Sequence, residues 1–103
     1  MALPFLLLAA LATFGGTPDD HVFETAIRPL LREYCLQCHS SEKHKGDLDL
    51  ERFDSLERVR REPATWQRVI EQLHDREMPP PEKPQPRVEE RERIVSFAQS
   101  VLD

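Results

Sequence analysis

The chain is organised around the stretch Cys35-Leu36-Gln37-Cys38-His39. The pattern C-x-x-C-H is typical of a covalent haem attachment site. Two thiols separated by two residues reach the two vinyl groups on one porphyrin edge and form thioether bonds there. The adjacent imidazole binds iron when it is neutral, and its other nitrogen donates to a carbonyl that fixes the ring orientation. The motif therefore predicts one covalently bound haem c, held by the sulfurs of Cys35 and Cys38, with His39 as an iron ligand.

Other uses of a cysteine pair fit this sequence less well. A thioredoxin-like C-x-x-C needs a strand–helix–strand context, which the surrounding residues do not show. A zinc site needs about four protein ligands, and the chain offers two cysteines with His39, His44 and His74 unevenly placed. Zinc remains an alternative on these residues. A disulfide across a two-residue gap closes a very small ring and stabilises little.

The composition describes one small globular domain. The chain has 103 residues, of which 39% are hydrophobic and 32% are charged. A domain of this size has a modest core, and a large apolar prosthetic group would strengthen it. The net charge of −5 and the absence of a basic stripe argue against nucleic-acid binding.

The first 16 residues form an apolar leader. Residues 2–14 are almost wholly apolar and are followed by Gly15-Gly16. This length suits a signal-peptide core and falls short of the about 20 residues that span a bilayer as a helix. We therefore expect a leader over residues 1–16, a domain over residues 17–103, and export to the periplasm or beyond. An uncleaved leader that tethers the protein to the membrane, or a buried N-terminal helix, are the alternatives.

Amphipathic stretches predict helices, and no stretch alternates long enough for a strand, so the fold class is all-α. The first helix runs into Cys35. Pro29 either begins a second helical segment or kinks the first helix. Asp54 is expected to cap a short helix that ends before Pro63, which opens the next helix; another ends the chain. The expected apolar positions are Val22, Phe23, Ala26, Ile27, Leu30, Leu31 and Tyr34, then Trp66, Val69, Ile70 and Leu73, then Val88, Ile94, Val95, Ala98, Val101 and Leu102. The expected solvated face of the last helix is Glu89, Glu90, Arg91, Glu92 and Arg93.

A second iron ligand is expected where the third of these helices ends. Met78 is followed by three prolines and is the only methionine besides Met1. A thioether is a suitable ligand opposite histidine and raises the reduction potential of the iron. The prolines stiffen the loop that carries the sulfur. His74 is the alternative ligand, since two histidines also give a six-coordinate iron.

Trp66 is expected to anchor the core rather than to relay electrons. Its indole N–H needs a hydrogen-bond partner when the ring is buried. A haem propionate would serve, and Trp66 is therefore counted among the residues that bind the cofactor.

Several of these segments together resemble a known family. The run Ile27-x-Pro-Leu-Leu-x-x-Tyr-Cys-x-x-Cys-His39 is followed by Lys45-Gly-x-Leu-x-Leu50, Trp66-x-x-Val69 and Glu77-Met-Pro-Pro80. This order resembles class I cytochrome c, and more specifically the planctomycete-type cytochrome c domain, over roughly residues 23–102. The resemblance implies a bundle of about four helices around the haem, with His39 as proximal ligand and Met78 as distal ligand. In that family the domain usually precedes much larger regions, so the chain is either a stand-alone carrier or a fragment of a multidomain protein.

The functional expectation is a small exported carrier of single electrons that is not an enzyme. With His39 and Met78 on both sides of the iron, no position remains for a small-molecule substrate. Its partners would be redox proteins. The alternative is a haem-bearing sensor or interaction module that docks on a larger enzyme.

Overall fold

The computed structural model describes residues 18–103, and every regular element in that part of the chain is helical. This confirms the all-α class. The apolar leader, the first of the two expected segments, lies outside the described residues. Within residues 18–103, none of the helices combines the length and the apolar character needed to cross a bilayer.

The first helical run is continuous but contains one widened turn. It consists of α1 (Pro18–Val22), the π-helical η1 (Phe23–Ile27) and α2 (Arg28–Tyr34). Pro29 lies in the first turn of α2, where its missing N–H is tolerated, and the N–H of Arg28 reaches back to the carbonyl of Phe23. The widened turn therefore lets the helix continue past Pro29.

The remaining helices begin and end close to their expected positions. They are the 3₁₀ turn η2 (Lys45–Asp47), the short α3 (Leu56–Arg60), α4 (Pro63–His74) and α5 (Val88–Leu102). The expected cap of α3 was wrong by one residue. The hydroxyl of Ser55 accepts from the N–H of Arg58 at 3.2 Å, whereas Asp54 pairs with the Arg58 side chain. Ser55 adopts the extended backbone that an N-cap needs.

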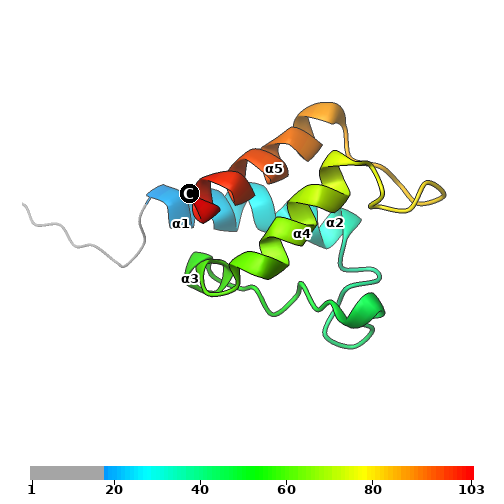
Figure 1. Ribbon diagram of the computed structural model, residues 1–103, viewed down its shortest axis with the longest axis horizontal. Coiled ribbons are helices and arrows are strands. Elements are labelled where there is room, and N and C mark those ends of the chain that lie inside the picture. The colour runs from blue at the N-terminus through cyan, green and yellow to red at the C-terminus, as the bar shows by residue number, and fades with distance from the viewer. Residues whose placement is uncertain (1–17) are drawn as a thin grey trace, which may run out of the picture.

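The helices bury one apolar core. α5 packs against α4 and η1, and α3 packs against both α4 and α5 (Figure 1). Phe23 stacks on Phe97 with ring centroids 5.4 Å apart, and Phe53 meets Trp66 edge to face at 5.3 Å. The core consists of Phe23, Ile27, Leu30, Leu31, Leu50, Phe53, Leu56, Val59, Trp66, Val69, Ile70, Leu73, Ile94, Phe97 and Ala98.

Four residues differ in burial from the expectation. Val22 and Val88 are exposed by 44% and 57%, although both were assigned to apolar faces. Glu90 and Arg91 are each only 7% exposed, although both were assigned to the solvated face of the last helix. The buried stripe of α5 runs through Glu90, Arg91, Ile94, Phe97 and Ala98, which is a continuous helical face. Glu90 and Arg91 form hydrogen bonds with distant residues, which cannot be deduced from the spacing of apolar residues.

Two long connections lie at the same end of the molecule. The chain between α2 and α3 leaves the end of α2, and the proline-rich connection leaves α4 and returns to α5 (Figure 1). The last residues of α2 and α4 therefore come together beside these connections, and this is where the cavities lie.

Candidate functional site

Two adjoining cavities open between the end of α2 and the end of α4. Their volumes are about 310 and 370 Å3, within the usual range for small-molecule sites. The walls that they share are formed by Cys35, His39, Lys45, Gly46, Leu73 and Met78. The attachment motif and the expected second ligand thus face the same space, although they lie 39 or more positions apart in sequence.

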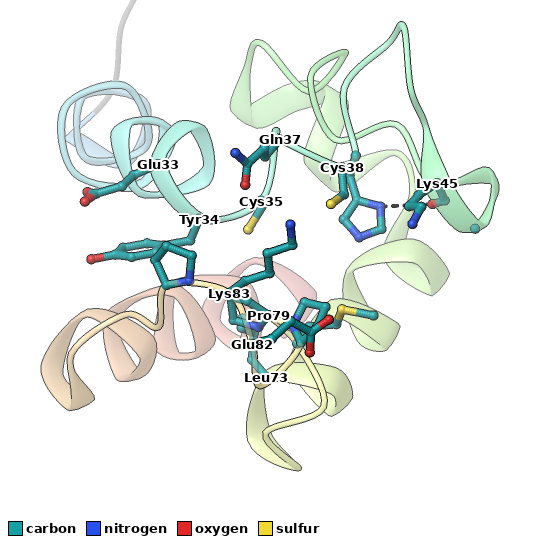
Figure 2. A pocket seen from close by; sticks show the side chains of 15 residues that line it. Glu33, Tyr34, Cys35, Gln37, Cys38, Lys45, Leu73, Pro79, Glu82 and Lys83 are labelled. Atoms are coloured by element: carbon teal, nitrogen blue, oxygen red, sulfur yellow. Dashed lines mark hydrogen bonds between the residues drawn. The ribbon is translucent and has the colours of Figure 1, made fainter.

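The attachment motif forms a tight turn that continues α2. The N–H of Cys35 donates to Leu31 at 2.9 Å, and that of His39 donates to the carbonyl of Cys35 at 3.0 Å. Figure 2 shows both cysteine sulfurs directed towards the space that Leu73 and Pro79 bound on the other side. Burial raises the pKa of the Cys35 thiol to about 11, so this thiol is neutral at physiological pH.

The imidazole of His39 is held by a backbone carbonyl. Its Nδ1 lies 3.0 Å from the carbonyl oxygen of Lys45 (Figure 2, dashed line). A carbonyl only accepts, so Nδ1 carries the proton and Nε2 keeps a free lone pair for a metal. The carbonyl is fixed in turn, because the N–H of Lys45 donates to Cys38 at 2.8 Å.

The turn that presents this carbonyl has an unusual backbone. His44, Gly46 and Asp47 have φ angles of 28°, 65° and 61°. Only glycine adopts this left-handed region without cost, so the two other residues store strain. Strained backbone of this kind is often found where a functional group must be oriented. Here the oriented group is the Lys45 carbonyl.

Met78 lines both cavities, and its backbone is tied on both sides. Its N–H donates to Gln72 at 3.2 Å, and its carbonyl accepts from Arg91 at 2.9 Å. His74, the alternative ligand, lines neither cavity. Its side chain is 77% exposed and lies beside Asp75. The arrangement therefore favours Met78 as the partner of His39.

Trp66 is buried in the core rather than in a cavity wall. It is fully buried, and its Nε1 has no hydrogen-bond partner among the described residues. The next turn of the same helix contributes Arg68 and Val69 to the wall of the second cavity. An unpaired buried N–H costs about 1–3 kcal/mol, so an acceptor that reaches this N–H would stabilise the fold.

A polar network joins the end of α2 to the start of α5 at the edge of the first cavity. The hydroxyl of Tyr34 donates to Glu90 at 2.8 Å, and the N–H of Arg87 donates to the same carboxylate at 2.9 Å. The hydrogen bond from Tyr34 to Glu90 raises the pKa of Tyr34 to about 12. The hydrogen bonds from the Arg87 backbone and from Tyr34 lower the pKa of Glu90 to about 2. Sequence reasoning did not find the contact between Tyr34 and Glu90, because these residues lie 56 positions apart.

The comparison with known families agrees with this geometry. The model of a family described as Planctomycete cytochrome C matches residues 35–82, from the first cysteine through the loop after Met78. This match supports a planctomycete-type cytochrome c domain that includes residues 35–82. No curated protein and no solved structure matches the chain significantly.

A cytochrome c domain implies a covalently bound haem c and supports an electron-transfer role. The described residues fit such a group. Two thiols, a tethered imidazole and a thioether line the same space, and the indole of Trp66 lacks an acceptor that a propionate would supply. Within residues 18–103, no set of three or more His, Cys, Asp or Glu side chains converges, as the zinc alternative would need.

Proposed function

We propose that the protein is an exported c-type cytochrome that carries single electrons, with His39 and Met78 as axial ligands of the haem iron. The observation that carries this proposal is that the tethered His39 imidazole and the Met78 thioether line the same two cavities as the Cys35 thiol. The haem would supply one-electron chemistry, by cycling its iron between the ferrous and ferric states.

Each group of residues has a defined task in this proposal. The sulfurs of Cys35 and Cys38 anchor the cofactor at one edge. The Lys45 carbonyl holds the His39 ring in one orientation, which also raises the basicity of the iron-binding nitrogen. Leu73 and Pro79 are buried on the opposite wall and exclude water from the site. If both His39 and Met78 bind the iron, no position on it would remain for a substrate.

The place of action and the class of partner are further parts of this proposal. The apolar leader of residues 1–16 supports export to the periplasm, where haem is normally attached to C-x-x-C-H, with a membrane tether if the leader is retained. The partners in this proposal are other redox proteins. The chain would exchange electrons with them and would bind neither nucleic acid nor a metabolite.

The first experiment is a haemochrome spectrum on protein matured in a host that attaches haem c. The expected result is the spectrum of a haem with two thioether bonds, together with a mass increase of one haem and no thiol that can be alkylated. A colourless protein with both thiols free would refute the proposal.

The second experiment separates a carrier from an enzyme or a gas sensor. The reduced holoprotein is titrated with carbon monoxide, which needs an open position on the iron. A carrier with both axial positions filled binds carbon monoxide weakly and slowly. Rapid, tight binding would contradict the carrier and favour the sensor or an enzyme.

A further inference from the structure

Arg91 is a buried cation whose hydrogen bonds all go to neutral oxygens. Its guanidinium donates to the carbonyl of Leu73 at 3.0 Å, to that of Met78 at 2.9 Å and to the side-chain oxygen of Gln85 at 2.8 Å. The residue is 7% exposed, and burial, together with the charge of Arg76, lowers its pKa. Burying a guanidinium without a carboxylate partner is costly, and these three hydrogen bonds offset part of that cost.

The three acceptors belong to the end of α4 and to the loop that follows it. Leu73 lies in the last turn of α4, where the ends of the carbonyl groups favour a positive charge, and its carbonyl also accepts from the N–H of Arg76 at 3.2 Å. Met78 and Gln85 lie near the two ends of the proline-rich loop. A single side chain of α5 therefore connects the helix end with both ends of the loop.

Gln85 also donates hydrogen bonds to carbonyls of the proline-rich loop. Its side-chain amide donates to the carbonyls of Pro79, Pro80 and Lys83 at 3.2, 2.9 and 3.0 Å. Residues 78–87 include five of the nine prolines, which have no N–H to offer. The backbone of the loop therefore has few N–H groups that can donate hydrogen bonds, and the side chains of Arg91 and Gln85 donate instead.

The backbone of Met78 is consequently fixed from two helices at once. Gln72 of α4 accepts from its N–H at 3.2 Å, and Arg91 of α5 donates to its carbonyl. Only the side chain remains to reach into the cavities. A thioether is a soft, neutral ligand, so its bond to iron depends on how well the backbone is positioned.

We propose that Arg91, with Gln85, is a positioning residue for the distal side of the haem: it holds the Met78 loop so that the thioether stays on the iron. This inference rests on the proposed His39 and Met78 ligation. It assigns a role to a residue outside the cavity walls, since Arg91 lines neither cavity and reaches the site only through the carbonyls of Leu73 and Met78.

The test compares ferric holoproteins that carry Arg91→Lys, Gln85→Ala or the control Arg93→Lys. Arg93 lies on the same helix, two residues further on, and is exposed. Free imidazole is the probe, because it competes with the thioether for the iron. The weak red absorption band of a thioether–ferric haem bond and the midpoint potential are measured alongside, and urea unfolding reports stability.

We expect Arg91→Lys to increase the imidazole association constant by about tenfold, which corresponds to the loss of one charge-assisted hydrogen bond. Gln85→Ala should give a smaller increase in the same direction, with a weaker red band and a lower potential. Arg93→Lys should leave the imidazole association constant, the red band and the midpoint potential unchanged. Gln85→Ala also keeps the test decisive if Arg91→Lys does not fold, since Gln85 is exposed and lies outside the core.

Two different failures are distinguishable. If the wild-type holoprotein lacks the red band, the proposed His39 and Met78 ligation is wrong, and this inference falls with it. If the wild type shows the band but Arg91→Lys and Gln85→Ala bind imidazole as the wild type does, only the positioning role is wrong. Lower stability with unchanged imidazole affinity would likewise overturn it, since that is the result of a merely structural contact.

Discussion

The substitution Trp66→Phe would show whether the buried indole N–H is satisfied by the haem. Trp66 is fully buried and packs edge to face on Phe53, and its Nε1 has no partner within the described chain. Phenylalanine keeps an aromatic ring there but removes the N–H. The change therefore separates the packing of the ring from its hydrogen bond.

The magnitude follows from two contributions to the free energy of unfolding. Phenylalanine lacks about three heavy atoms of tryptophan, which costs about 2 kcal/mol at roughly 0.8 kcal/mol per buried methylene-sized group. If the N–H donates to a charged propionate, about 1.5–3 kcal/mol is lost in addition. The expected destabilisation of the holoprotein is therefore about 3.5–5 kcal/mol. If the N–H stays unpaired, its removal instead recovers about 1–3 kcal/mol, and the net change is close to zero.

The assay is urea unfolding of the ferric holoprotein, followed by far-ultraviolet circular dichroism. With a slope of about 2 kcal/mol per molar, the expected shift in midpoint is about 2 M. Phe97→Leu is the matched control, because it also removes about three heavy atoms from a buried ring but no hydrogen-bonding group. A shift for Trp66→Phe equal to or smaller than that of Phe97→Leu would refute the reasoning.

Three further predictions concern the distal ligand, the cap of α3 and the carboxylate at the cavity edge. Met78→Ala should lower the midpoint potential and let carbon monoxide bind rapidly to the reduced protein, because the thioether is lost; an unchanged potential would remove Met78 from the ligand set. Ser55→Ala should destabilise the holoprotein by about 1 kcal/mol and Asp54→Ala by less than about 0.5 kcal/mol in urea unfolding, and the reverse order would contradict the assigned cap. Glu90 has a folded pKa of about 2, against about 4.3 when unfolded, so it stabilises the fold above pH about 4.3 and loses that effect as the pH falls towards 2. Glu90→Gln should flatten the dependence of stability on pH in that window, and an unaltered pH profile would contradict the role of this carboxylate.

The haem motif and the helices were accessible from sequence because both depend on neighbouring residues. C-x-x-C-H places two thiols and an imidazole within five consecutive positions, so its chemistry needs no tertiary information. The helical periodicity predicted α4 from Pro63 to His74 as the structure has it. Nothing in the sequence showed that the carbonyl of Lys45 would meet the imidazole of His39.

The expected solvated face of α5 was wrong for two of its five residues, Glu90 and Arg91, and the reason is physical. Charged side chains are rarely buried, so a pattern of polarity places them in water. Glu90 and Arg91 are buried because partners from distant parts of the chain satisfy them, namely Tyr34 for the carboxylate and the carbonyls of Leu73 and Met78 for the guanidinium. Such pairs cannot be deduced from the spacing within one helix.

The choice between His74 and Met78 as iron ligand also depends on contacts that the sequence does not show. Both residues have the chemistry to bind iron, and both lie near the end of α4, so the sequence alone left both open. The structure places Met78 on the cavity walls and His74 in solvent, because the loop turns back towards α5 and is held there by Arg91 and Gln85. The sequence by itself predicted a covalently bound haem and the places where the helices form. Only the tertiary structure showed which distant side chain lines the same cavities as the histidine, since that depends on contacts between segments that approach each other only in the folded chain.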